Sequence, residues 1–219
     1  MCLGCRLLLL RTVDGELNFG GINLKKYKEW INWVKITDKE PFNRDWGFEQ
    51  TIMYGNQILQ PPSVGNVDSG STMIYITSEA FDVYSKSLPG SKIDPKTELL
   101  EIPEGSLGQM QSLFFVINGV SYEFPPSAQI WPHALNELLG GKADAYYSVI
   151  GPIGGTGGDS TPPGFINGYM FLQRFYTAVS LLCLQKQCAY THILNYSSTT
   201  RPTRGLDSRI PLMSTRHTG

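Results

Sequence analysis

Val-Asp-Ser-Gly-Ser-Thr, residues 67–72, breaks an otherwise apolar part of the chain with a run of polar turn residues. The apolar run Met73-Ile74-Tyr75-Ile76 follows it directly. A carboxylate between two buried strands is costly unless it is hydrogen-bonded. The three hydroxyl groups and the glycine amide of this segment can supply those bonds. Taken alone, the segment favours an Asx turn at Asp68, because Asp, Ser and Gly are ordinary turn residues.

The sequence around this segment predicts a mainly β fold with two or three short helices. The 219 residues include 23 Gly and 14 Pro among many β-branched and aromatic residues, which is typical of short strands joined by tight turns. Leu113–Tyr122 is the clearest hairpin signal, with Asn118-Gly119 as its turn. Helices are expected over Glu79–Leu88, with Ser78 as N-cap, and over Pro132–Leu139. The length allows one domain or two small ones.

Further motifs occur in a fixed order along the chain, before and after residues 67–72. They are Gly15–Gly21 (GELNFGG), Trp33–Thr37 (WVKIT), Phe81–Tyr84 (FDVY), Phe115–Ile130 and Phe165–Leu172 (FINGYMFL). With D-S-G-S at its centre, this series resembles the C-terminal lobe of pepsin-like aspartic proteases. The last motif is similar to that of fungal, polyporopepsin-like members. Because several ordered motifs are far more specific than a bare D-S-G, the resemblance predicts a pepsin-like acid protease lobe.

The resemblance implies a role for each residue of the central segment. Asp68 would be one of the two catalytic carboxylates of an aspartic endopeptidase. Ser69 would brace the two catalytic loops against each other, and Ser71 would hydrogen-bond the outer oxygen of Asp68. Gly168 would let its backbone approach the catalytic loop, where a Cβ would clash.

The resemblance also implies how a substrate would bind. The backbone of Gly70 and the hydroxyl of Thr72 would hold a peptide or protein substrate as an extended strand, by β-augmentation. The family is typically secreted, so the implied location is extracellular. Catalysis would need neither a metal nor another cofactor.

The chemistry needs two carboxylates that share one proton, and the D-[TS]-G pattern occurs once in this sequence. Asp14-Gly15 and Asp159-Ser160-Thr161 lack the pattern. We therefore expect a half-enzyme that is inactive alone and needs a first lobe or a second copy to complete the site. In this interpretation residues 15–180 form the lobe, residues 1–14 are an atypical N-terminal extension, and residues 181–219 are an atypical, disordered tail.

Two alternative functions stay open. One is a homodimer in which each chain donates Asp68, as in retroviral proteases. The other is a non-catalytic module that binds peptides or polymers through exposed Trp30, Trp33 and Trp131. His133 follows Trp131-Pro132 in a helix-like stretch and is interpreted as a surface residue with no catalytic role.

Charge and cysteine patterns exclude several other classes. Between Thr12 and Ser180 acidic residues outnumber basic ones, and the excess of basic residues in the flanks has no aromatic platform for nucleic acid. The apolar run Leu7–Leu10 ends at Arg11, too early for a signal peptide or a membrane span. Cys2 and Cys5 have no second pair with zinc spacing, and disulfides that involve Cys183 and Cys188 cannot be assigned.

Overall fold

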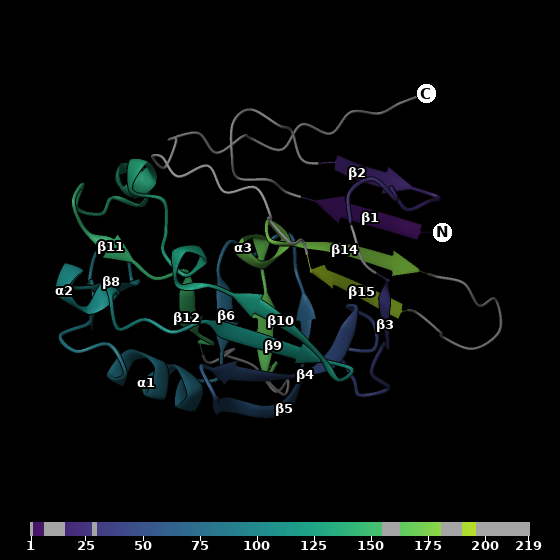
Figure 1. The fold of residues 1–219 in the computed structure, drawn as a ribbon, viewed down its shortest axis with the longest axis horizontal. Coiled ribbons are helices and arrows are strands. Elements are labelled where there is room, and N and C mark those ends of the chain that lie inside the picture. The colour runs from purple at the N-terminus through teal and green to yellow at the C-terminus, as the bar shows by residue number, and fades with distance from the viewer. Residues whose placement is uncertain (1, 7–15, 28–29, 155–162, 181–189, 196–219) are drawn as a thin grey trace.

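The computed structural model describes residues 2–6, 16–27, 30–154, 163–180 and 190–195. These residues form two larger sheets and one small sheet, with short helices around and between them (Figure 1). The α-helices are α1 (Ser78–Lys86), α2 (Glu104–Leu107) and α3 (Tyr169–Leu172), and the 3₁₀ helices are η1 (Pro126–Ala128) and η2 (His133–Leu139). The prediction of a mainly β fold with few short helices is confirmed.

A seven-stranded mixed sheet forms the centre of the molecule. Its strands, in spatial order, are β10 (Val120–Phe124), β9 (Leu113–Ile117), β4 (Gly47–Tyr54), β5 (Gln57–Val67), β13 (Phe165–Asn167), β6 (Ile74–Ile76) and β12 (Ile150–Pro152). The hairpin expected over residues 113–122 is β9–β10. Asn118 and Gly119 both have positive φ, as a tight hairpin turn requires.

The strands β4 and β5 are longer than the sequence indicates. The pattern around Tyr54-Gly55-Asn56 predicts two short strands, whereas β5 continues through Pro61-Pro62 as far as Val67. Proline has no N–H to donate to a ladder, so it is tolerated at bulges. The pairing moves here from Gln50 with Ser63 to Ile52 with Gln60 and skips both prolines. The bulge thus lets one strand reach directly to Asp68.

A five-stranded antiparallel sheet lies beside the central one (Figure 1). It consists of β2 (Glu16–Phe19), β1 (Cys2–Arg6), β14 (Phe175–Ser180), β15 (Tyr190–Asn195) and β3 (Asn32–Lys35), in that order. The expectation of disorder over 181–219 is therefore wrong for residues 190–195, because β15 pairs with both β14 and β3. The rest of that segment lies outside the described residues.

Aromatic side chains fill the interior between the sheets. Phe115 contacts Phe124 and Phe171 edge to face, with ring centroids 5.8 and 5.1 Å apart. Phe175 contacts Phe171 at 4.6 Å. All four are 2% exposed or less, and burying one such side chain contributes about 1.5–3 kcal/mol. This packing gives α3, which follows β13, a fixed place against the sheet.

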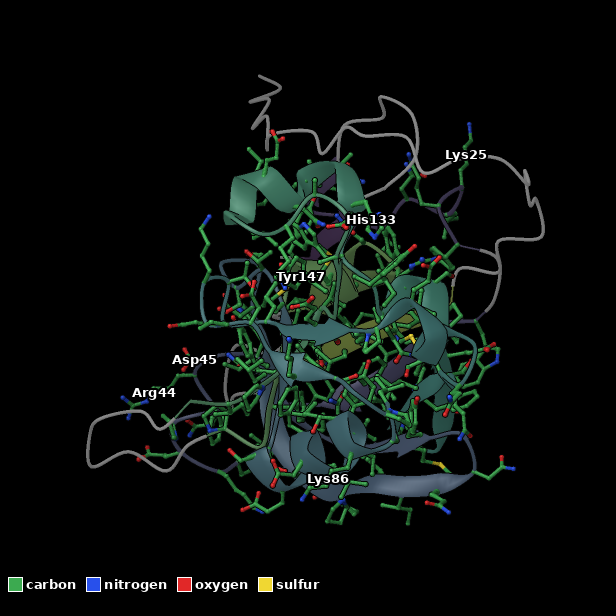
Figure 2. All side chains as sticks on the ribbon, turned by 90° about the vertical axis from the view of Figure 1, so that its left-hand side faces the viewer. Lys25, Arg44, Asp45, Lys86, His133 and Tyr147 are labelled. Atoms are coloured by element: carbon green, nitrogen blue, oxygen red, sulfur yellow. The ribbon has the colours of Figure 1, made fainter. Side chains whose placement is uncertain are left out.

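Most charged side chains lie at the periphery, whereas Asp94 is buried. Lys25, Arg44, Asp45 and Lys86 point outward, whereas Tyr147 lies inside the molecule (Figure 2). Tyr147 belongs to a small sheet of β11 (Tyr146–Tyr147), β8 (Leu100–Ile102) and β7 (Lys92–Ile93). Among the described residues, no helix is long and apolar enough to cross a bilayer.

Candidate active site

Asp68 begins a loop at the end of the long strand β5. Its carboxylate accepts hydrogen bonds from the Gly70 amide at Oδ1 (2.9 Å) and from the Ser71 hydroxyl at Oδ2 (2.6 Å). The Ser71 amide also donates to the Asp68 carbonyl oxygen at 3.3 Å. These are the local bonds of an Asx turn, and they fix the direction of both carboxylate oxygens. The contact predicted between Ser71 and Asp68 is present.

The strand β13 and the helix α3 hold this loop from behind. β13 lies between β5, to which it is parallel, and β6, to which it is antiparallel. The Asp68 amide donates to the Asn167 carbonyl oxygen at 3.1 Å. The Tyr169 and Met170 amides donate to the carbonyl oxygens of Ser71 and Thr72, at 2.7 and 3.0 Å. Three backbone hydrogen bonds therefore fix this loop to residues 167–170.

Gly168 stands at the closest approach of these two segments. A Cβ built on Gly168 would lie 2.2 Å from the Met73 carbonyl oxygen and 2.5 Å from that of Ser71. Both atoms belong to the backbone and cannot rotate away. The sequence-based prediction that a side chain at residue 168 would clash with the loop agrees with this geometry.

The outer side of the loop is open. Ser69, Gly70 and Thr72 are exposed, and Asp68 is half-buried. The carboxylate is thus held by the protein on one side and accessible to a ligand on the other. The roles predicted for Ser69, Gly70 and Thr72 involve atoms of another loop or of a substrate, and they stay predictions.

Sequence reasoning missed two residues next to this loop. The side chains of Asn167 and Gln50 hydrogen-bond each other reciprocally: Asn167 Nδ2 donates to Gln50 Oε1 at 3.0 Å, and Gln50 Nε2 donates to Asn167 Oδ1 at 3.4 Å. Both residues are 1% exposed or less. The available signal was Asn167 itself, a polar residue at the end of the apolar run Phe165-Ile166.

No group of three or more His, Cys, Asp or Glu side chains that could hold a metal ion occurs within the described ranges. Cys183 and Cys188 lie outside those ranges, as does Gly15. His133 is not an isolated surface residue: its ring lies 4.1 Å from that of Tyr146, and its Nε2 is buried.

The fold and the loop together define a class: a mainly β lobe that presents a hydrogen-bonded aspartate at the end of a central strand. Comparison with known proteins identifies the family of this lobe. The chain belongs to the eukaryotic aspartyl protease family, whose model matches residues 9–180.

Two curated relatives and one solved structure agree with this assignment. Polyporopepsin from Irpex lacteus is 39% identical over 167 residues, which cover 76% of this chain and 48% of that protein. Cathepsin E from Rattus norvegicus is 25% identical over 169 residues, 74% of this chain and 38% of that one. The crystal structure of the aspartic proteinase from Irpex lacteus matches with a TM-score of 0.78 and 33% identity over 90% of this chain and 57% of that chain. The chain thus spans about half the length of these relatives.

Proposed function

We propose that this chain supplies one lobe of an aspartic endopeptidase, with Asp68 as one of its two catalytic carboxylates. The observation that carries this proposal is how the Asp68 side chain is hydrogen-bonded and exposed. Both of its oxygens are oriented by hydrogen bonds from Gly70 and Ser71, while the loop around it is exposed. Membership of the eukaryotic aspartyl protease family and 39% identity to polyporopepsin support this role for the aspartate of the loop.

The proposed chemistry uses Asp68 and a second aspartate a few ångströms away. Like charges so close cannot both ionise, so the pair shares one proton. The ionised partner takes a proton from a bound water, which attacks the peptide carbonyl. The protonated partner hydrogen-bonds the developing oxyanion and later donates its proton to the leaving amine. Asp68 alone cannot play both roles, so a first lobe or a second copy of the chain completes the site.

The exposed edge of the loop suits an extended substrate. The Gly70 backbone and the Thr72 hydroxyl are both exposed beside Asp68, and they would hold the main chain of a peptide as an added strand. Ser69 would contact the matching loop of the second half. By resemblance to the family, we further propose that the protein acts outside the cell at acidic pH.

The decisive experiment measures cleavage of an unfolded protein at about pH 4, where one carboxyl of such a dyad is protonated. The chain is assayed alone and with a first-lobe polypeptide, with and without pepstatin, an inhibitor of aspartic endopeptidases. We expect pepstatin-sensitive cleavage when the first lobe is present, and we expect Asp68→Asn to abolish it. Asp82→Asn is the matched control, because Asp82 is an exposed carboxylate on α1, outside the loop, and pairs with Lys86. Cleavage that survives Asp68→Asn would contradict the proposal.

A non-catalytic binding module is a second candidate, favoured by the exposure of two tryptophans. Trp30 is 69% exposed and Trp33 is 39% exposed, whereas Trp131, also predicted as exposed, is buried at 5%. Trp131 is buried because its neighbours pair with the sheet: its amide donates to Tyr147 and Ile130 bridges to Ser148. Peptide binding that is unaffected by Asp68→Asn and lost in Trp30→Ala would support this alternative.

A further inference from the structure

Asn167 is an unusual residue for its position. It ends β13 after the apolar residues Phe165 and Ile166, it is 0% exposed, and asparagine is depleted in strands. A polar side chain that breaks a local preference in the interior often marks a functional site. Here the carbonyl of the same residue accepts the hydrogen bond of the Asp68 amide. Asn167 therefore connects the interior of the sheet to the catalytic loop.

The partner of Asn167 lies two strands away. Gln50 belongs to β4, and β5 runs between β4 and β13. The pairing of Asn167 with Val67 and of Phe48 with Gly65 places Phe48, Gln50, Phe165 and Asn167 on one face. Gly65 has no side chain on that face, and Phe48 meets Phe165 at 5.2 Å. A ring pair and an amide pair thus lie next to each other across β5.

The amide pair fixes one register of β13. Each carboxamide donates to the other and both are buried, so a slip of β13 or the loss of one partner leaves buried polar atoms without hydrogen bonds. An apolar pair would tolerate a small displacement, because dispersion contacts are not directional. The residues held in register are those that bind the loop backbone: Asn167 to Asp68, Tyr169 to Ser71 and Met170 to Thr72.

We propose that Gln50 and Asn167 are positioning residues, whose paired carboxamides hold β13 and through it the backbone of Asp68 in the geometry that catalysis requires. This inference rests on the proposed function for the catalytic role of Asp68. Neither residue touches the substrate. Their effect passes through the Asn167 carbonyl oxygen to the Asp68 amide.

The test is hydrogen exchange in the full chain, followed amide by amide by NMR. Gln50→Leu is compared with Gln129→Leu, because Gln129 is also a fully buried carboxamide donor, bonded instead to the carbonyl oxygens of Gln111 and Phe124. We expect Gln50→Leu to accelerate exchange at Asp68 by at least about tenfold, which corresponds to about 1.4 kcal/mol. In each variant the exchange rate of the Asp68 amide is divided by that of the core amide of Phe115, which removes any shared loss of global stability.

A positioning role requires that Gln129→Leu leave the ratio of the Asp68 exchange rate to the Phe115 exchange rate as it is in the unmodified chain. Equal ratios in the two variants would overturn the proposal and leave Gln50 a merely structural residue. If Gln50→Leu does not fold, exchange is measured in the unmodified chain instead. We then expect the Asn167 carboxamide protons and the Asp68 amide to exchange at the same rate. Independent exchange of these protons would contradict the proposal. The measurement needs no turnover, so cleavage that survives Asp68→Asn would refute the proposed function without affecting this result.

Discussion

At the scale of single residues, Gly168 shows how little space separates the Asp68 loop from β13 and α3, which support it. The adjacent residues Asn167, Tyr169 and Met170 all bond the loop backbone, so the two segments cannot move apart without losing hydrogen bonds. A side chain at residue 168 must therefore displace either the loop or β13.

Gly168→Ala is expected to destabilise the chain by about 1–3 kcal/mol, the usual cost of overpacking. The reason is that the added Cβ would meet the carbonyl oxygens of Met73 and Ser71 at 2.2 and 2.5 Å. Urea unfolding followed by fluorescence measures the loss. Gly105→Ala is the matched control, because Gly105 lies in α2 with nothing within 4 Å of its Cβ position. Equal stability of the two variants would contradict the close approach.

At the scale of elements, the helix α1 begins one residue earlier than the sequence indicates. Thr77, not Ser78, is the N-cap: its hydroxyl oxygen accepts from the Ala80 amide at 3.3 Å. Both residues are good N-caps, so propensity could not choose between them. The Thr77 amide donates to Gln60 Oε1 at 3.0 Å, which holds Thr77 against β5. A tertiary contact thus fixes the start of the helix.

Thr77→Ala is expected to lower the free energy of unfolding by about 1 kcal/mol, the usual value of a lost N-cap. Ser78→Ala should change it by less than about 0.5 kcal/mol, because Ser78 is exposed and makes one long contact of 3.5 Å to Ile153. Thermal or urea unfolding of both variants checks the assignment. A larger loss in Ser78→Ala would show that the helix begins at Glu79.

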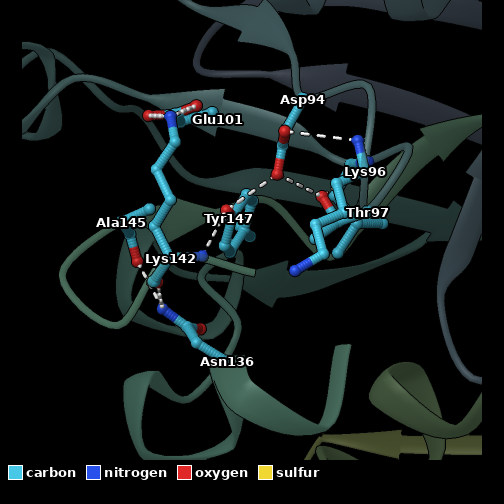
Figure 3. A network of polar contacts seen from close by, with 9 residues as sticks. Asp94, Lys96, Thr97, Glu101, Asn136, Lys142, Ala145 and Tyr147 are labelled. Carbon is cyan, nitrogen blue, oxygen red and sulfur yellow. Dashed lines mark hydrogen bonds and ion pairs between the residues drawn. The ribbon is translucent and has the colours of Figure 1, made fainter. Parts of the chain in front are cut away.

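The small sheet of β7, β8 and β11 is joined to its neighbours by a polar network (Figure 3). The buried Tyr147 hydroxyl donates to Asp94 Oδ2 at 2.9 Å and accepts from the Lys142 amide at 3.0 Å. Thr97 also donates to Asp94. The hydrogen bond from Tyr147 is the main cause that lowers the pKa of Asp94, whereas burial raises the pKa of Tyr147.

This network should make stability depend on pH. Because the pKa of Asp94 is lowered in the folded state, its contribution is full above the ordinary value of 3.8 and is lost as the pH falls through the folded value. Tyr147→Phe removes the main cause of the lowered pKa of Asp94, so the destabilisation by this substitution should be largest above about pH 4 and should shrink as the pH falls below that value. A part independent of pH remains, since the Lys142 amide also loses its acceptor.

Urea unfolding of Tyr147→Phe and of the unmodified chain at several pH values measures how the difference in their free energies of unfolding depends on pH. Tyr146→Phe is the control: Tyr146 is adjacent, and its ring packs on His133 rather than on Asp94. The same pH dependence in both variants would rule out Asp94 as the responsible group.

At the scale of the whole molecule, the chain holds one D-[TS]-G loop and spans about half of its relatives. Two carboxylates from two loops are needed for the proposed reaction. We therefore expect any rate of cleavage by the chain alone to fall with the square of the chain concentration on dilution, because two copies must then form one site. A dilution series with sedimentation at each concentration measures this. A rate proportional to concentration, from a monomer, would contradict the need for a second half.

The sequence by itself determined the features that depend on neighbouring residues. The Asx turn at Asp68 and the hairpin around Asn118-Gly119 follow from local side-chain chemistry, and the close approach at Gly168 was expected from motifs in a fixed order. The order of motifs also indicated the family and the fold. The predictions of the Asx turn and the hairpin succeeded because each rests on hydrogen bonds or backbone angles within a few residues.

Only the tertiary structure decided which distant segments meet. Gln50 and Asn167 are 117 residues apart, and their pairing depends on the registers of β4, β5 and β13 together. The strand at residues 190–195 lacks a local pattern and is defined by its neighbours β14 and β3. The physical reason is that strand pairing satisfies backbone groups that every sequence carries, so the partner is selected by packing across the whole molecule and not by the residues of the strand itself.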